Sequence, residues 1–355
     1  MGTDRRPGQS NWRTDTLILV SVNQQDKTVG LLSIPRDLYV NIPGVGPQRI
    51  NTADFYGEYY HFPGGGPQLL KQTIQQNLGI RVHYYARIGF DGFRKAIDTL
   101  GGIDVDVDCA LQESNFYDDY GRADLNFQPG VQHMDGVTAL RYARSRYTTN
   151  DYDRGRRQRK VILAMWDKAL SLNLLPKWPD LYSQFRDSVQ TDLGTVEFAG
   201  LAWIGSQLHM DRIKSRAIDA RVGTPWITPN GEWVLLPNAE RIHSLLVEFY
   251  SLPTPDVDAV AADGAQIQIV SGNKQLGDVA AVELKRQGLA VTDSQTSPTL
   301  AASSSIVVYH AKPATVQRLI SLLRLNPANV RTVNNSSDGP DLQVILGRDY
   351  NSCQK

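Results

Sequence analysis

The sequence predicts an α/β protein, an α+β sandwich in which helices flank a mixed central β-sheet, followed by a small C-terminal β-α-β-β-α-β domain. Short apolar runs rich in branched residues alternate with segments of helical periodicity as far as residue 250. Residues 251–266 lack periodicity and contain two prolines, and the alternation then resumes. A chain of 355 residues is more typical of two domains than of one. We therefore predict a first domain at 1–250, a linker at 251–266 and a second domain at 267–350.

The first elements form a predicted β-hairpin. Thr16–Val22 is an almost continuous apolar run, which is typical of a buried strand, and Thr28–Ile34 predicts the returning strand. A turn centred on Gln25 pairs Val22 with Thr28. That register brings four charged residues to the open end of the hairpin, namely Arg13, Asp15, Arg36 and Asp37.

Helices and strands alternate through the rest of the chain. Apolar residues at helical spacing, closed by glycine or followed by turn residues, predict helices at 68–79, 92–102, 137–146, 153–172 and 239–250. Strands are predicted at 82–88, 103–108, 211–218 and 232–237, and the alternating acids of 103–108 indicate a solvated face. The second domain is predicted from strands at 267–270, 289–293, 306–310 and 342–347 and helices at 276–288 and 314–325.

Charge is concentrated in one stretch, residues 141–160, which holds seven arginines and one lysine against two aspartates. The whole chain is formally neutral, which argues against a nucleic-acid-coating protein. Helical spacing places Arg154, Gln158, Val161 and Met165 on one face. Arginine binds phosphate oxygens through a planar fork that stays charged. Converging arginines with aspartates therefore indicate a ligand with more than one phosphate, bridged by a divalent metal such as Mg²⁺.

The alternative for the same residues is that they pair with surface carboxylates or coat a solvated face. Five residues lie off the proposed helix face and are assigned to it: Arg141, Arg156, Arg157, Arg159 and Lys160. The two cysteines, Cys109 and Cys353, predict neither a disulfide framework nor a zinc site. No apolar run approaches the roughly 20 residues of a membrane helix. Because the chain enters a strand almost at once, we expect an upstream strand or anchor.

Five ordered sequence blocks between Met1 and about Tyr250 resemble the LytR-CpsA-Psr family. They are "MGTDRR", "RTDTLILVSVN", "LLSIPRDLYVNIPGVGPQRINTA", "GFRKAIDTLGGIDVDVD" and "GVQHMDGVTALRYARSR…DYDRGRRQRKVI". Residues 267–347 resemble the LytR C-terminal accessory domain. The resemblance implies an extracytoplasmic protein, usually on one N-terminal membrane helix. Its implied activity is Mg²⁺-dependent transfer of a glycopolymer from a polyprenyl-pyrophosphate donor to peptidoglycan, with release of polyprenyl phosphate.

The resemblance also implies roles for individual residues. Asp4 and Asp15 correspond to metal-binding carboxylates, and Asp151 to the active-site aspartate, with Asp153 as its competitor. Residues implied to bind the pyrophosphate are Arg13, Arg36, Arg144, Arg146, Arg154 and Gln158, and Arg36 is also implied in catalysis.

Two other functions use the same residues and stay open at this point. One is a phosphohydrolase that cleaves the lipid pyrophosphate with water, and the other is a non-catalytic protein that binds the lipid carrier. The implied glycan is of the teichoic acid, capsule or arabinogalactan type. The membrane surface is an expected partner, reached through the lipid substrate or an N-terminal helix, and nucleic acid is not.

Overall fold

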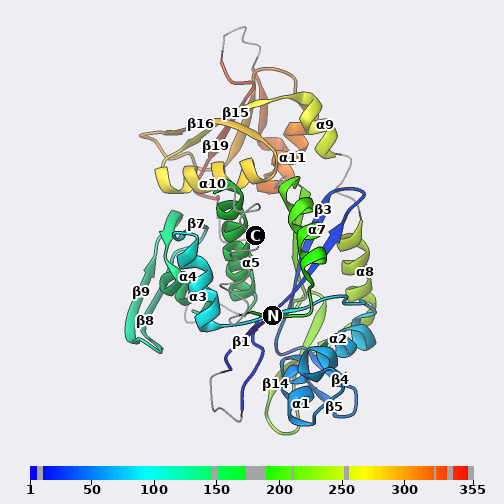
Figure 1. Ribbon diagram of the computed structural model, residues 1–355. Coiled ribbons are helices and arrows are strands. Elements are labelled where there is room, and N and C mark those ends of the chain that lie inside the picture. The colour runs from blue at the N-terminus through cyan, green and yellow to red at the C-terminus, as the bar shows by residue number, and fades with distance from the viewer. Residues whose placement is uncertain are drawn as a thin grey trace. The chain divides into compact units, whose positions relative to one another are not determined.

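The computed structural model describes residues 1–5, 11–145, 151–172, 189–208, 212–251, 256–323, 325–333 and 339–350, without the side chains of 151, 152, 256 and 257. The chain forms two compact units. Unit 1 comprises Met1–Ile103, His133–Leu208 and Lys214–Ser251, and unit 2 consists mainly of Asp104–Gln132 and the chain after residue 252. Figure 1 labels the helices and strands of both units.

The sheet of unit 1 is built from two three-stranded pieces. One has the order β12-β3-β2 and the other β1-β6-β11, with β1 parallel and β11 antiparallel to β6. An isolated antiparallel bridge joins Gly2 to Thr16, so the two pieces meet at the start of the hairpin. The predicted mixed sheet is thereby confirmed. Its strands are β1 (Gly2–Thr3), β2 (Leu17–Asn23), β3 (Thr28–Ile34), β6 (Ala86–Gly89), β11 (Val189–Thr191) and β12 (Ile213–Ala217).

The β2–β3 hairpin differs by one residue from the predicted register. Asn23 pairs with Thr28, so the connection has four residues instead of five. The Asn23 side chain closes this turn, because its Oδ1 accepts hydrogen bonds from the backbone amides of Gln25 and Asp26 at 3.0 and 3.2 Å. Lys27 completes the turn with a φ of 49°. Continued to the open end, this register puts Asp15 opposite Arg36.

Helices surround this sheet, and apolar side chains from both form one core. Leu32, Leu69, Ile74 and Ile218 are among its buried members. Two further hairpins, β4 (Tyr39–Ile42) with β5 (Gly46–Arg49) and β13 (Gly223–Ile227) with β14 (Trp233–Pro237), extend from unit 1. The helices are α1 (Ala53–Tyr59), α2 (Gly65–Leu78), α3 (Phe90–Thr99), α4 (Gly136–Arg144), α5 (Asp151–Ser171), α7 (Thr195–Ser206) and α8 (Ala239–Tyr250).

Helices α1 and α2 approach each other closely at glycine. A Cβ added to Gly66 would lie 2.1 Å from the backbone oxygen of Asp54, and one added to Gly57 would lie 2.5 Å from the Cα of Gly66. Gly79 ends α2 with a φ of 71°, a left-handed conformation that glycine adopts without strain. This close contact fixes α1, and with it Asp54, against the core.

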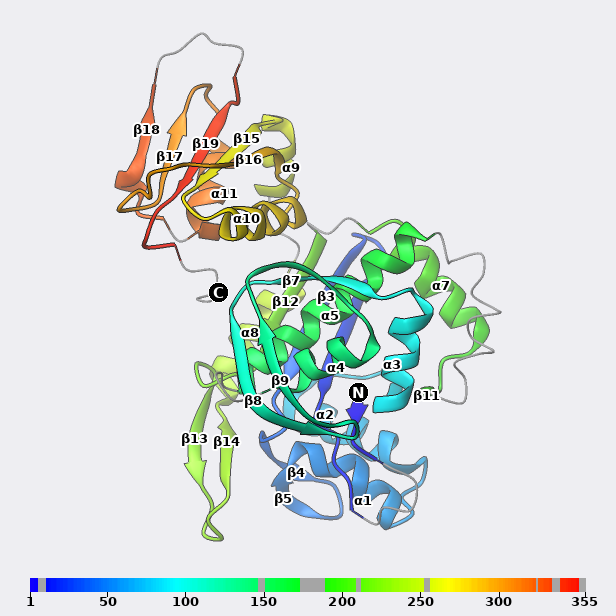
Figure 2. The ribbon, with the colours of Figure 1, turned by 90° about the vertical axis from the view of Figure 1, so that its left-hand side faces the viewer.

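Unit 2 contains a β-arm and the C-terminal domain. The arm pairs β8 (Leu111–Asp118) with β9 (Gly121–Phe127), and β7 (Ile103–Val107) with β10 (Gly130–Met134). The C-terminal sheet has the order β16-β15-β19-β17-β18, and Figures 1 and 2 show α10 and α11 on the same side of it. Its elements are β15 (Gln266–Ser271), α10 (Lys274–Arg286), β16 (Ala290–Thr296), β17 (Ser305–Val308), α11 (Pro313–Leu323), β18 (Val330–Thr332) and β19 (Leu342–Leu346). The predicted β-α-β-β-α-β order is thus confirmed, with the short strand β18 added.

Three features of unit 2 differ from expectation. Helix α9 (Asp256–Asp263) forms inside the predicted linker, because Val260 is buried in the C-terminal core. Asp106 and Asp108 are buried instead of lying on a solvated face, and Asp106 Oδ2 pairs with Arg286 Nη1 at 3.3 Å. Cys109 is disulfide-bonded. Each depends on contacts between segments distant in sequence, which local patterns do not report.

Residues 1–5, 11–145, 151–172, 189–208, 212–251, 256–323, 325–333 and 339–350 are the described part of the chain. Within them, every helix is too short or too polar to span a bilayer.

Candidate anion-binding site

A narrow cleft lies where the open end of the β2–β3 hairpin meets helix α5. Its cavity of about 20 Å³ has room for roughly one water molecule. Three segments of the chain supply the walls: the hairpin end, the first turns of α5 and the end of β12. The lining residues are Asp15, Leu17, Ser33, Ile34, Pro35, Arg36, Arg154, Gly155, Gln158, Ala217 and Ile218.

Arg36 lies between two carboxylates at the hairpin end. Its Nη1 donates to Asp15 Oδ2 at 3.1 Å, and its Nε donates to Asp37 Oδ2 at 3.3 Å. Asn51 Nδ2 donates to the second oxygen of Asp15, Oδ1, at 3.1 Å. These contacts follow from the register that sets Asp15 opposite Arg36. An anion that enters the cleft would compete with Asp15 for the Arg36 guanidinium.

Helix α5 supplies the opposite wall. Arg154 is buried, and Gln158 follows it by one turn, so both side chains reach the cleft from one face. Gln158 Nε2 also donates to the carbonyl of Ala143 at 3.3 Å, which ties α5 to α4. The structure therefore brings together four of the predicted site residues, Asp15, Arg36, Arg154 and Gln158.

Arg159 lies behind the cleft wall, a position that the sequence did not predict. Its Nη1 donates to Ser33 Oγ at 2.5 Å and its Nε donates to Ser215 Oγ at 2.6 Å. Burial, together with the positive charges of Arg156 and Arg216, lowers the pKa of Arg159 to about 10. Because Ser33 lines the cleft, Arg159 places a second layer of positive charge behind the cleft wall.

The assignment of this part of α5 to a solvated face was wrong. Arg157, Arg159 and Lys160 are all buried. Arg157 Nε donates to the carbonyl of Tyr142 at 3.0 Å, and its Nη2 donates to the carbonyl of Ser145. Arg157 thus satisfies carbonyls at the end of α4, which have no partner within their own helix. The available signal was the spacing of Arg157 to Val161, one turn apart on a buried stripe.

Asp4 and Arg13 contact each other and do not line the cleft. The backbone amide of Arg13 donates to Asp4 Oδ1 at 2.6 Å. The Arg13 guanidinium donates to Asn11 Oδ1 at 2.5 Å and to the carbonyl of Trp12 at 2.9 Å. It also lies over the Phe55 ring, 5.4 Å from its centroid. Arg13 is therefore directed to α1, although it is two residues from Asp15.

Of the remaining predicted residues, Arg144 ends α4 and Asp153 lies in the first turn of α5. Arg144 does not line the cleft, and its guanidinium lies 4.4 Å from the centroid of the Phe90 ring. Asp153 pairs with Arg156 at 3.3 Å. Arg146 and the side chain of Asp151 lie outside the described residues, so the choice between Asp151 and Asp153 stays a prediction.

A buried polar network supports the strand that carries Asp15. Thr14 Oγ1 donates to Asp54 Oδ2 at 2.8 Å, and Arg87 Nη1 donates to Asp54 Oδ1 at 2.8 Å. Thr14 and Asp54 are both 0% exposed and Arg87 is 5% exposed. Burial raises the pKa of Asp54, and the nearby Arg87 charge opposes that rise. Since Thr14 lies between Arg13 and Asp15, the network fixes the position of both.

The oxygen atoms near Asp15 are compatible with a Mg²⁺ ion. Asn51 Oδ1 is buried and lacks a hydrogen-bond partner in the described structure, and the same amide contacts Asp15 through Nδ2. Mg²⁺ typically takes one or two carboxylates and completes its shell with other oxygens. Across the described part of the chain, His, Cys, Asp and Glu form no group of three that could hold a metal. A metal here would therefore depend on Asp15, the Asn51 oxygen and oxygens of the ligand.

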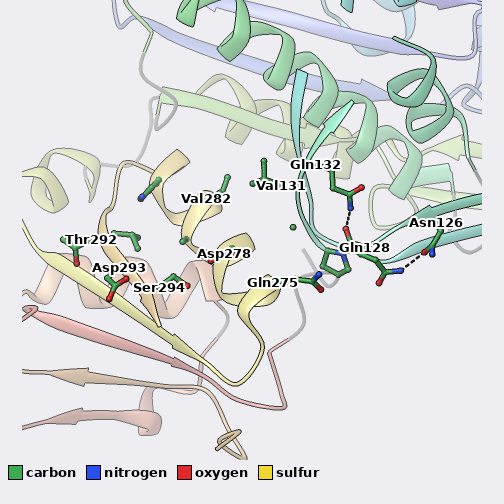
Figure 3. A pocket seen from close by; sticks show the side chains of 15 residues that line it. Asn126, Gln128, Val131, Gln132, Gln275, Asp278, Val282, Thr292, Asp293 and Ser294 are labelled. Atoms are coloured by element: carbon green, nitrogen blue, oxygen red, sulfur yellow. Dashed lines mark hydrogen bonds between the residues drawn. The ribbon is translucent and has the colours of Figure 1, made fainter. Parts of the chain in front are cut away.

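A larger cavity of about 770 Å³ lies within unit 2 (Figure 3). Amide side chains from the end of β9 and from β10, including Gln128 and Gln132, lie opposite polar residues of α10 and β16 such as Asp278 and Thr292. Gln128 Nε2 donates to Asn126 Oδ1 at 2.6 Å. None of the predicted site residues that the structure describes lines this cavity, so it is distinct from the cleft.

Fold and cleft together define an α/β protein with an arginine-lined cleft, a candidate anion site, at the end of a β-hairpin. The chain belongs to the LytR_cpsA_psr family, whose model matches residues 1–248. Residues 266–350 match a second model, described as LytR cell envelope-related transcriptional attenuator.

Similar proteins include enzymes of cell-wall assembly. The chain is 36% identical over 195 residues to the polyisoprenyl-teichoic acid–peptidoglycan teichoic acid transferase TagU of Oceanobacillus iheyensis, covering 54% of this chain and 57% of that protein. It is 30% identical over 252 residues to TagV of Bacillus subtilis, a transferase of the same name, covering 69% and 61%. The chain thus spans about six-tenths of the length of these relatives.

Solved structures agree with the fold. The crystal structure of B. subtilis TagV has a TM-score of 0.58 and 28% identity, covering 70% of this chain and 92% of that one. A structure of TagT bound to LIIa-WTA has a TM-score of 0.54 and 28% identity, covering 70% and 86%.

Proposed function

We propose that this protein transfers a glycopolymer from a polyprenyl-pyrophosphate donor to peptidoglycan and releases polyprenyl phosphate. The observation that carries the proposal is the convergence of Arg36, Arg154 and Gln158 on one cleft, in a chain of the LytR_cpsA_psr family. Relatives named as teichoic acid transferases support a polyprenyl-linked donor and a peptidoglycan acceptor. The glycan is of the teichoic acid, capsule or arabinogalactan type.

The reaction is a displacement at the phosphorus that carries the glycan. An acceptor hydroxyl oxygen bonds to this phosphorus, the bond to the bridging oxygen breaks, and polyprenyl phosphate leaves with the electron pair. Arg36 and Arg154 hold the diphosphate and offset its charge as the leaving oxygen develops. We assign the hydroxyl proton to a carboxylate at the start of α5, with Asp151 preferred to Asp153.

The small size of the cleft limits how the donor can bind. The cavity has room for roughly one water molecule, so we infer that the donor displaces Arg36 from Asp15 as it enters. The freed Asp15 carboxylate and Asn51 Oδ1 would hold a Mg²⁺ ion, with Asp4 as a further candidate ligand. Bound there, Mg²⁺ would neutralise charge on the diphosphate oxygens.

We also place this protein outside the cytoplasm, at the membrane surface where its lipid-linked donor resides. The disulfide at Cys109 supports this location, because disulfides persist in oxidising compartments. The family relationship supports it as well.

The proposal is tested by incubating the protein with a polyprenyl-pyrophosphate glycan, with and without peptidoglycan fragments. We expect glycan on the acceptor only in the complete mixture, and a loss of about 10²–10³ in rate for Arg36→Gln. Arg221→Gln is a matched control, because Arg221 also pairs with an aspartate but is largely exposed and does not line the cleft. Release of free glycan phosphate at equal rates with and without acceptor would establish a phosphohydrolase instead. Glycan attachment that stays intact in cells carrying Arg36→Gln would point to a non-catalytic lipid-carrier-binding protein.

A further inference from the structure

Four aromatic residues form an exposed surface on helix α1, next to Arg13. We call Phe55, Tyr56, Tyr59 and Tyr60 the aromatic shelf. Their spacing of four residues stacks the rings in two pairs. The centroids of Phe55 and Tyr59 are 5.7 Å apart with an interplanar angle of 23°, and those of Tyr56 and Tyr60 are 5.7 Å apart at 8°.

The outer half of the aromatic shelf is open to solvent. Tyr59 is 63% exposed and Tyr60 is 58% exposed, and their rings meet edge to face at 5.0 Å. The inner half is anchored, because Tyr56 packs against the core and Phe55 meets the buried Trp12 edge-on at 5.9 Å. The shelf is therefore a surface of aromatic rings held in place from below.

The support beneath α1 makes this arrangement rigid. Asp54 is fixed by Thr14 and Arg87, and Gly57 allows the backbone of α2 to approach closely. A site whose groups are already ordered loses less conformational entropy on binding. An exposed tyrosine alone needs no explanation, but two stacked pairs on a rigid helix form a preorganised apolar surface.

The inner edge of the aromatic shelf touches a residue implied in pyrophosphate binding. The Arg13 guanidinium lies 5.4 Å from the centroid of Phe55, and in the described chain its other partners are neutral oxygens of Asn11 and Trp12. A phosphate held by Arg13 would therefore sit at the edge of the shelf. Anything bonded to that phosphate on the shelf side would meet the aromatic rings.

We propose that the aromatic shelf binds the first sugar rings of the donor glycan, an inference that rests on the proposed function. The axial C–H groups of a pyranose form an apolar face that packs on an aromatic ring, whose face is electron-rich. The donor sugar is the occupant because it is covalently bonded to the phosphate, so its ring must lie beside the group that holds that phosphate. Successive sugars would continue from Phe55 toward Tyr59 and Tyr60.

The test measures binding of two probes to the full chain by calorimetry, without acceptor. One probe is a short-chain prenyl pyrophosphate bearing a disaccharide, and the other is the same prenyl pyrophosphate without sugar. We expect Tyr59→Ala to weaken binding of the glycosylated probe about tenfold and to leave the bare probe unchanged. Tyr59→Trp should retain binding of both. Tyr117→Ala is the matched control, since Tyr117 is 73% exposed on β8, outside the shelf.

Three other outcomes would each reject sugar binding by the aromatic shelf, and they can be told apart. In the first, Tyr59→Ala and the unchanged protein bind the glycosylated probe equally while both also bind the bare probe. That result rejects sugar binding by the aromatic shelf and leaves the proposed function in place. A separate titration of Tyr59→Ala with peptidoglycan fragments covers the acceptor. Weaker binding of these fragments, with binding of the donor probes unaltered, assigns the shelf to the acceptor and rejects the donor. Failure of the unchanged protein to bind either probe rejects the shelf and the proposed function together.

Discussion

Removal of the Asp54 carboxylate is expected to destabilise unit 1 and loosen the candidate site. In Asp54→Ala, Arg87 loses a hydrogen-bonded partner at 2.8 Å while remaining 5% exposed, and Thr14 loses its acceptor. Breaking a buried ion pair by deleting one partner costs about 3–5 kcal/mol, because the other charge stays buried. We expect the lower half of this range, because Glu58 still pairs with Arg87 at 2.8 Å.

Thermal unfolding measures this cost. At about 2–4 °C per kcal/mol for a domain of this size, a loss of about 3–4 kcal/mol lowers Tm by roughly 6–16 °C. Asp54→Asn is the control, because it keeps the shape and an acceptor for one of the two donors. Arg87→Met combined with Asp54→Ala should be no less stable than Asp54→Ala alone, since no buried charge is then left unpaired. A cost below about 1 kcal/mol for Asp54→Ala, or simple additivity in the double variant, would refute this reasoning.

The same residue predicts a pH dependence. Because burial raises the pKa of Asp54, the folded state binds this proton more tightly than the unfolded state does. The contribution of Asp54 to stability is therefore fully present below its ordinary pKa of 3.8 and is lost as the pH rises through the raised folded value. The difference in unfolding free energy between the unchanged protein and Asp54→Asn should accordingly increase as the pH falls from 7 toward 4. A difference that shrinks on acidification would contradict the direction of this shift.

Two further predictions concern the cleft. Arg159→Met should weaken binding of a prenyl pyrophosphate about tenfold, since it removes the positive charge behind Ser33, while the free energy of unfolding changes by less than about 2 kcal/mol. Calorimetry measures the affinity, and denaturant unfolding measures the stability. An unaltered affinity would exclude Arg159 from the site. Chelation of divalent cations should lower the rate of glycan transfer, and Asp15→Asn should lower the affinity for added Mg²⁺ in a titration. A transfer rate that does not change with chelator would show that the reaction needs no divalent metal.

Local sequence patterns were sufficient for the β2–β3 hairpin, for helix α5 and for four of the residues that meet in the cleft. The apolar runs of β2 and β3 and the helical spacing of Arg154 and Gln158 depend on short-range periodicity, which a sequence displays directly. The register was one residue off, because the hydrogen bonds of the Asn23 side chain shortened the turn. The motif order added the family, which spacing alone does not provide.

What only the tertiary structure decided is which charges are buried and what they contact. Arg157 and Arg159 occur in a charged run whose sequence predicts a solvent-exposed face. In the structure Arg157 contacts Tyr142, 15 residues away, and Arg159 contacts Ser33, 126 residues away. Arg13 is directed to Phe55 because α1 packs beneath it, a contact that no local pattern reports. The sequence determines where a charge or an aromatic ring stands along a helix or strand. The free energy of burying that group, and so its role, depends on neighbours that only folding brings within contact distance.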